Sequence, residues 1–287
     1  MVWFIFACLT AFFEATKDVF SKKSLEDIDE YVVAWSLPFF ALPFLLPILL
    51  FTGIPPLGER FWPALFTGGS LYAITLILYM KAIKSSDLSI TVPMLTFTPL
   101  FLLITSPLIV GEFPSIFGLI GIFLIVTGSY LLNINKKSHG YFAPFKALLK
   151  EKGPRLMLVV AFIWSITSNI DKIGLQNSSP LFWVIAVDAF VALLMFPLCK
   201  SRGNGKTHQI HANLRALLKV GLFGGLTSVC QMTAISLTLV AYVISIKRTS
   251  AIMGVLFGYL IFKEKGVRER LVGVVVMVLG VLFITVF

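Results

Sequence analysis

Residues 111–128 read GEFPSIFGLIGIFLIVTG, and residues 263–280 read KEKGVRERLVGVVVMVLG. Each segment places a glutamate before an apolar run in which two glycines lie seven residues apart. At an offset of 152, the matches include Glu112 and Glu264, Leu119 and Leu271, Gly121 and Gly273, and Gly128 and Gly280. An apolar run of about 20 residues can cross the hydrocarbon core of a bilayer as a helix. The two segments therefore predict a membrane helix that occurs twice in the chain.

The repetition extends beyond these two segments. Ala82 matches Ala234 at the same offset, and an offset of 150 aligns Ala11-Phe12 with Ala161-Phe162, Lys22 with Lys172, Leu25 with Leu175 and Pro47 with Pro197. A run of such matches with one two-residue slip indicates a duplication. We therefore predict a first five-helix repeat at 1–135, a basic connecting loop at 136–156 and a second five-helix repeat at 157–287.

Composition indicates that a bilayer is the solvent for most of the chain. Hydrophobic residues make up 57% of the sequence and charged residues only 13%, whereas a soluble domain has about a quarter charged residues. Ten spans are expected, near 2–20, 31–51, 62–80, 88–110, 115–133, 157–175, 181–199, 217–236, 240–262 and 269–287. Lipid favours helices because backbone groups need hydrogen bonds within their own segment, and continuous apolar runs do not fit the strands of a barrel.

The predicted fold is an all-α polytopic membrane protein with ten transmembrane helices, arranged as two inverted five-helix repeats. The inversion follows from the number of spans in each repeat. Because five is odd, the second copy enters the membrane in the opposite direction from the first. Inverted repeats are common in secondary transporters, where the substrate site lies at the repeat interface.

Charge placement predicts the orientation. The loops after the odd-numbered spans hold 19 of the 24 lysines and arginines, and basic loops stay in the cytoplasm. These loops are therefore expected inside, with both termini outside an inner (plasma) membrane. The net charge of +10 follows from this bias and from attraction to anionic lipid, so nucleic acid is not an expected partner. The start at Met1–Thr10 has no basic region and is expected to be a retained first span.

The repeat of five spans resembles the EamA repeats of the drug/metabolite transporter superfamily. The resemblance rests on Gly111-Glu112, on its partner Lys263-Glu264, and on the paired glycines of the helices that follow. It covers nearly the whole chain and implies two EamA-like bundles that carry a metabolite. Many members of that family are thought to keep both termini in the cytoplasm, whereas the charge distribution of this chain predicts both termini outside.

Lys247 and Arg248 are charged residues about seven residues inside the ninth predicted span, a rise of about 10 Å. Their repeat partners are Leu95 and Thr96, so the fold does not require charge there. An ionised side chain inside a span is costly unless it faces a cavity or a partner. The alternative is that both side chains reach the nearer interface.

A lysine beside a planar guanidinium suits a carboxylate or a phosphate. The run Lys247-Arg248-Thr249-Ser250 also resembles the ninth span of the sugar-phosphate and nucleotide-sugar branch of the superfamily. There, a Lys-Arg pair is thought to grip a phosphate, and the resemblance implies a similar role for Lys247 and Arg248.

Three charged residues, Glu14, Lys17 and Asp18, share one face of the first span at spacings of three and four residues. Their repeat partners are uncharged: Trp164, Thr167 and Ser168. Glu14 and Lys17 either line a cavity or neutralise each other, and Asp18 is expected at the interface because it is close to an acidic loop.

Asp188 is a lone carboxylate in the middle of the seventh span, where the repeat partner is Pro38. It is a candidate proton site or counter-ion for Lys247 and Arg248. The neutral side chains of Asn169 and Gln231 are expected to form hydrogen bonds between helices.

Two further features are expected to shape the helices. Glu112 and Glu264 occur in both halves, and each is expected to cap a helix or bind loop amides, with gating as the alternative. Pro93, Pro99 and Pro107 free backbone carbonyls and should bend the fourth span.

Several motifs of other protein classes fail here. Gly205-Lys206-Thr207 lacks the first glycine of a P-loop, because position 200 is Lys200. His208 and His211 have no carboxylate or cysteine cluster nearby, which disfavours a metal site. The sequence has no HExxH, GxSxG or CxxC motif. An enzyme is therefore not expected, and neither is a cofactor.

These features predict a secondary active transporter that moves a small polar metabolite, anionic or carboxylate-bearing, by alternating access. The predicted substrate-binding residues are Lys247, Arg248, Lys17 and Glu14, and the predicted coupling or counter-ion residues are Asp188 and Glu14. An exporter of amino acids or other zwitterions is the alternative within transport, and a non-transporting membrane scaffold or partner subunit is the alternative from another class. The expected partners are a small-molecule substrate and the lipid bilayer; a coupling proton and a homodimer stay open.

Overall fold

A computed structural model describes residues 2–85, 92–133, 150–202, 210, 212–253 and 267–286. Within these ranges the regular structure is entirely helical, as the sequence predicts. The helices of the first half are α1 (Val2–Asp27), α2 (Glu30–Thr52), α3 (Phe61–Ser85), the 3-10 helix η1 (Val92–Phe97), α5 (Thr98–Ile109) and α6 (Ile116–Asn133). Those of the second half are α8 (Lys152–Gln176), α9 (Pro180–Arg202), α11 (Leu214–Leu237), α12 (Val240–Lys247) and α14 (Val267–Val286).

Five of the described helices are long and apolar enough to cross a membrane, namely α2, α3, α8, α9 and α11. Three shorter apolar helices lie at Met94–Ile109, Ile116–Leu131 and Val272–Val286. The helix α1 has 26 residues, but charged side chains interrupt its apolar sequence. The chain is therefore an all-helical protein with several membrane-crossing segments, while the count of ten spans stays a prediction.

Two predicted spans differ from continuous helices. In the first half, η1 ends at Phe97 and α5 begins at Thr98; in the second half, α12 ends at Lys247 and a turn follows. Proline explains the first break, because Pro99 has no N–H for the Leu95 carbonyl, and the Thr98 hydroxyl donates to that carbonyl instead at 2.8 Å. At the offset of 152 the two breaks occupy equivalent positions.

The turn after α12 has no proline to explain it. The backbone N–H of Arg248 donates to the Ser245 carbonyl at 3.0 Å, and the N–H of Thr249 donates to the Ile246 carbonyl at 2.9 Å. These bonds span three residues and belong to a 3-10 turn, which is tighter than an α-helix. The expectation of one helix over 240–262 is therefore wrong at residues 248–249, and residues 254–262 lie outside the described part.

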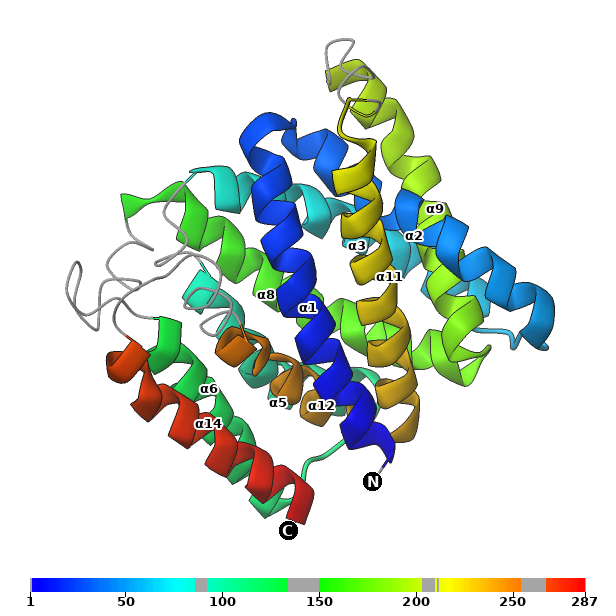
Figure 1. Cartoon of the computed structure of the whole chain (residues 1–287). Helices are drawn as coiled ribbons and strands as arrows, with labels where there is room; N and C mark the ends of the chain where they lie inside the picture. Colours follow the sequence, from blue (N-terminus) through cyan, green and yellow to red (C-terminus); the bar gives the residue numbers. More distant parts are fainter. Residues whose placement is uncertain are drawn as a thin grey trace.

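The helices α6 and α14 pack side by side along one edge of the molecule (Figure 1). Their contact is made by the paired glycines: Gly121 faces Gly280, and Gly128 faces Gly273. A methyl group at Gly121 or Gly280 would collide with the backbone carbonyl of the other, so only glycine allows this approach. Because residue numbers rise along one helix while they fall along the other, the two helices run antiparallel.

A second contact also occurs twice. The helix α11 packs on α2 where Gly221 faces Phe40, and α3 packs on α9 where Gly69 faces Phe190. Gly69 and Gly221 are 152 residues apart, and Phe40 and Phe190 are 150 apart, as in the sequence repeat. The two halves therefore use the same residues for the same helix contact.

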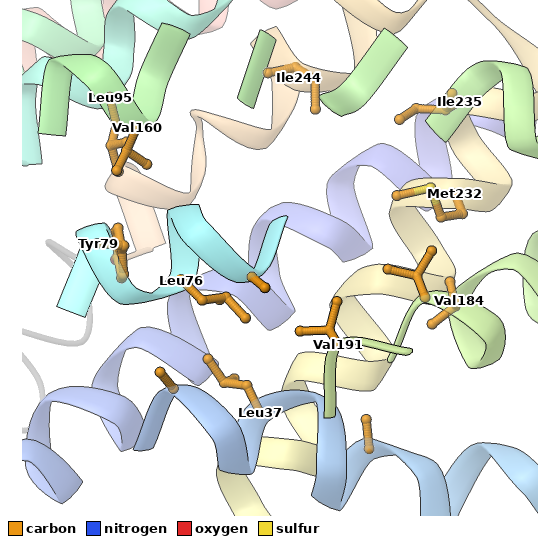
Figure 2. Packing of buried hydrophobic residues seen from close by; sticks show 14 of the residues in the cluster. Leu37, Leu76, Tyr79, Leu95, Val160, Val184, Val191, Met232, Ile235 and Ile244 are labelled. Atoms are coloured by element: carbon orange, nitrogen blue, oxygen red, sulfur yellow. The ribbon is translucent and has the colours of Figure 1, made fainter. Parts of the chain in front are cut away.

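Buried side chains from several helices meet in the centre of the molecule. Figure 2 shows Leu37 of α2, Leu76 of α3, Val184 of α9, Met232 of α11 and Ile244 of α12 converging from different directions. Large apolar side chains also cover the outside, among them Leu50, Phe51, Leu108 and Leu193. An apolar exterior around a packed core is the arrangement that suits a lipid environment.

Candidate functional site

A cavity of about 110 Å³ lies at the centre of the helix assembly. Its described lining comes from α1, α2, α3, α5, α8, α9, α11 and α12, but not from α6 or α14. A space of this size holds several water molecules or part of a small solute.

Most of the lining residues fall on repeat-equivalent positions. The pairs at an offset of 150 are Glu14 and Trp164, Lys17 and Thr167, Ser21 and Asp171, Leu37 and Val187, and Pro38 and Asp188. The pairs at an offset of 152 are Tyr72 and Gly224, Leu76 and Ser228, Tyr79 and Gln231, and Met80 and Met232. At these positions the two halves contribute different side chains, except for the pair Met80 and Met232. The repeat sets the place of the cavity, and the differences between the copies set its chemistry.

Lys247 enters the cavity from the last turn of α12. Its Nζ lies 3.4 Å from Glu14 Oε1 and donates a hydrogen bond of 2.8 Å to Gln231 Oε1. Gln231, expected as a neutral link between helices, therefore orients a charged side chain. Lys247 does not reach for a distant interface, because its contacts lie on α1 and α11.

Glu14 is shared by two lysines. Its Oε2 accepts a hydrogen bond of 2.7 Å from Lys17 Nζ, while its Oε1 faces Lys247. The sequence left open whether Glu14 and Lys17 line a cavity or neutralise each other. In the structure they do both, since they form an ion pair and line the cavity. Asp18 lies beside Lys17, with 3.4 Å between Oδ1 and Nζ, and its side chain is 43% exposed.

Arg248 caps the C-terminus of α12 and is only 7% exposed. Its Nη2 donates a long hydrogen bond of 3.4 Å to Thr98 Oγ1, and its Cζ lies 6.0 Å from the centre of the Trp164 ring. Its Nε is buried without a hydrogen-bond partner. Among the described residues no carboxylate lies within ion-pair distance of this guanidinium, so a buried cation faces the cavity without an anion.

Asp188 also lines the cavity, with 6% of its surface exposed. Within the described ranges it makes no ion pair with Lys247 or Arg248, so the counter-ion of Lys247 is Glu14. The physical reason is the packing of α1 against α12, which brings Glu14 within contact distance of Lys247. Asp188 remains a carboxylate in the cavity wall that has no described hydrogen-bond or ion-pair partner.

Asp171 is a lining residue that the sequence reasoning missed. It projects from α8 and accepts a hydrogen bond of 3.0 Å from Trp183 Nε1 of α9. The signal was available, because its repeat partner is Ser21 and a charge present in one half alone marks the other cavity residues as well.

Asn169 lies outside the cavity lining and links two helices, as expected for an amide in a helix bundle. Its Oδ1 accepts from Ser106 Oγ at 2.8 Å, and its Nδ2 donates to Thr105 Oγ1 at 3.0 Å. Glu112 caps a helix, but the helix is α12 and not the next one in the chain, since Glu112 Oε2 accepts a bond of 2.8 Å from the N–H of Val240.

Several sequence features lie outside the described residues. They are Glu264, Gly205-Lys206-Thr207, His208 and His211. Where the structure does describe side chains, no group of three or more histidine, cysteine or carboxylate side chains is placed to hold a metal ion.

Known proteins resemble the chain in two ways. The model of the EamA-like transporter family matches residues 1–134 and again residues 152–286. A solved structure, described only as the crystal structure of a protein, superposes with a TM-score of 0.76 at 14% identity, covering 98% of this chain and 95% of the other. At that identity the likeness concerns the fold alone. A search of curated protein sequences gave no significant match.

Proposed function

Because the chain belongs to the EamA-like transporter family, and is therefore an integral multi-pass membrane protein, we propose that it is a secondary active transporter of a small polar metabolite with an anionic group. The observation that carries the anionic character is Arg248, a buried guanidinium that faces the cavity with an unpartnered Nε. Burial of an uncompensated charge is costly, and a carboxylate or phosphate offers two oxygens in the geometry of the guanidinium fork. A bound anionic group would therefore supply what Arg248 lacks.

Lys247 has a secondary part in this proposal. Its charge is already shared with Glu14, and Gln231 fixes its position. Lys247 would contribute positive potential next to the bound anion while Arg248 makes the direct contact. Glu14 and Lys17 would hold Lys247 in place and complete the polar wall of the cavity.

Alternating access fits an inverted repeat of ten spans. Two observations support this arrangement: the antiparallel contact of Gly121 with Gly280 and of Gly128 with Gly273, and the equivalent helix breaks at Phe97 and Thr249. Interrupted helices beside a site at the repeat interface are a recurrent feature of secondary transporters. The cavity, lined by equivalent positions of both halves, would be that site.

A zwitterionic substrate is the second candidate, and Asp188 favours it. This carboxylate lines the cavity without a described partner, and the bond from Trp183 is the one hydrogen bond that Asp171 makes to a described side chain. An ammonium group would complement such a carboxylate while Arg248 binds the anionic end of the same molecule. A coupling proton on Asp188 would meet the same need when the substrate has no cationic group.

A membrane scaffold has no need for an unpaired guanidinium in a central cavity, which favours transport over that alternative. Thermal unfolding of the purified protein with a panel of anionic, zwitterionic and cationic metabolites tests the proposal. We expect anionic or zwitterionic compounds to raise the unfolding temperature of the wild type and to lose that effect in Arg248→Ala. Stabilisation by cationic compounds alone, or by none of the panel, would contradict the proposal.

A further inference from the structure

The two halves of the chain meet in a polar contact where α5, α8, α11 and α12 end or begin. We call it the interrepeat junction: Glu112, which follows α5; Lys172, near the end of α8; and Val240, the first residue of α12. It lies on the face of the molecule that carries the loops after the even-numbered spans, here called the even-loop face.

The side chains of the interrepeat junction satisfy one another closely. Glu112 Oε1 lies 3.1 Å from Lys172 Nζ, and Glu112 Oε2 accepts a hydrogen bond of 2.8 Å from the N–H of Val240. Lys172 Nζ also donates to the carbonyls of Ile235 at 2.6 Å and Thr238 at 2.8 Å, at the end of α11. The ion pair of Glu112 with Lys172 therefore joins the end of α11 and the start of α12 to the loop after α5.

Both side-chain contacts of Glu112 in this junction cross from the first half to the second. The same is true nearby, where the N–H of Ser115 donates to the Tyr242 hydroxyl oxygen at 3.1 Å. Another crossing links the loop after α2 to the loop after α8, because the N–H of Gly58 donates to the Asn177 carbonyl at 3.0 Å. At the even-loop face, hydrogen bonds and an ion pair thus hold the two halves together.

The interrepeat junction is directly coupled to the cavity. Lys172 follows Asp171, which lines the cavity, and α12 runs from Val240 in the junction to Lys247 in the cavity. A helix of this length spans only about 12 Å, so a movement of Glu112 reaches Lys247 through a single short helix. Gly111 has a φ of 72°, a backbone conformation that favours glycine, and this turn aims Glu112 at α12.

The chemistry of the junction suits a contact that breaks and re-forms. Its two charged side chains are 12% and 13% exposed, so water is close enough to replace the ion pair when the halves separate. Polar contacts of this kind give specificity of closure at modest net stability. An apolar seal of the same area would have to expose its whole surface to open.

From this geometry we propose that the interrepeat junction is the gate that closes the cavity at the even-loop face, and that it must break for the cavity to open there. The proposal rests on the proposed transport function. It names the residues that control whether the cavity is open at the even-loop face. The state described by the structure would then be the one closed at the even-loop face.

Cysteine accessibility tests the gate without any knowledge of the substrate. The three free thiols, Cys8, Cys199 and Cys230, are first replaced by alanine, and Ser228→Cys then introduces a single reactive thiol in the cavity wall. This protein is the parent for the comparison. A membrane-impermeant thiol reagent is applied to sealed vesicles of each orientation. A separate variant, Thr52→Cys, marks the even-loop face, because Thr52 is exposed at the end of α2.

We expect Glu112→Gln or Lys172→Met to speed labelling of the introduced thiol from the even-loop face by about tenfold, which corresponds to about 1.4 kcal/mol. The matched control is Glu59→Gln, which removes an exposed carboxylate from a loop on the same face and should label like the parent. Unchanged labelling, or an equal rise from both faces, would overturn the gate. Because the readout involves no substrate, a failed uptake assay would count against the proposed function and leave the gate standing.

Discussion

Glu14 is the residue on which the charge balance of the cavity depends. Its carboxylate touches Lys17 with one oxygen and Lys247 with the other. Removal of the carboxylate leaves two buried cations without this shared counter-ion, whereas removal of Lys17 leaves Glu14 still paired with Lys247. The two partners of the short ion pair are therefore not equivalent.

This difference predicts unequal costs of mutation. Glu14→Gln should lower the free energy of unfolding by about 3–5 kcal/mol, as expected when one partner of a buried ion pair is lost, and Lys17→Met should cost clearly less. Thermal unfolding in detergent measures both. A larger loss for Lys17→Met than for Glu14→Gln would show that Glu14 is not the shared counter-ion.

The sequence predicted the residues of the cavity better than their pairing. Glu14, Lys17, Asp188, Lys247 and Arg248 stand out because each is charged where the other repeat is not, a difference that is visible in the sequence. Which carboxylate pairs with Lys247 depends on the packing of α1 beside α12, and no sequence pattern reports that distance. Asp188 and Glu14 were both predicted as counter-ions, and in the structure it is Glu14 that lies beside Lys247.

The helices α6 and α14 are equivalent in the two repeats, and they pack against each other through equivalent glycines. Gly121 and Gly280 face each other across the two helices. Alanine at either position would place its methyl group against the backbone carbonyl of the other glycine. Because the contact is reciprocal, equal substitutions on the two sides should be equally damaging. The glycine pattern in the sequence predicted close packing but did not name the partner helix.

We expect Gly121→Ala and Gly280→Ala each to lower the free energy of unfolding by about 1–3 kcal/mol, the usual cost of overpacking. A control is Ile120→Ala, next to Gly121 but 40% exposed on the outer surface. Thermal unfolding of the three variants provides the comparison. If only one of the two glycines is sensitive, the reciprocal contact is wrong.

Helix breaks were only partly predictable. The prolines of the fourth span predicted a bend, and Pro99 explains why Thr98 covers the Leu95 carbonyl. The equivalent break after Lys247 has no proline within the described residues, and the high hydrophobicity around it favours an uninterrupted helix. Only the repeat offset could have transferred the break from one half to the other.

At the scale of the whole molecule, the two ends of the chain lie at the same end of the helix assembly (Figure 1). An even number of membrane crossings requires this arrangement. The charge distribution adds the direction, because the basic loops after the odd-numbered spans are expected in the cytoplasm. Both termini are therefore predicted outside.

Reporter fusions at the C-terminus test the orientation. A phosphatase that is active only outside the cytoplasm should be active when fused after Phe287, and a fluorescent protein that matures only inside should stay dark. The reverse pattern would show that the loops after the even-numbered spans are cytoplasmic. In that case the proposed gate would face the cytoplasm and not the outside, while the residues that form it would stay the same.

The repeat also explains how one cavity arises from two similar halves. Equivalent positions of both copies line it, so its location could be predicted from the sequence offsets once the copies were known to pack together. Its chemistry comes from positions where the two repeats carry different residues. Asp171 lines the cavity where the first repeat has Ser21, and Arg248 lines it where the first repeat has Thr96. The central claim is that Arg248 binds an anionic group of the transported molecule.

Uptake into proteoliposomes tests that claim most directly, with the compound that stabilises the wild type most strongly as the labelled substrate. Arg248→Ala should abolish uptake while the protein still inserts and folds, and Arg248→Lys should restore only part of it, because charge is kept but the guanidinium fork is lost. Arg60→Ala, in an exposed loop, should transport normally. Normal uptake by Arg248→Ala would contradict the account.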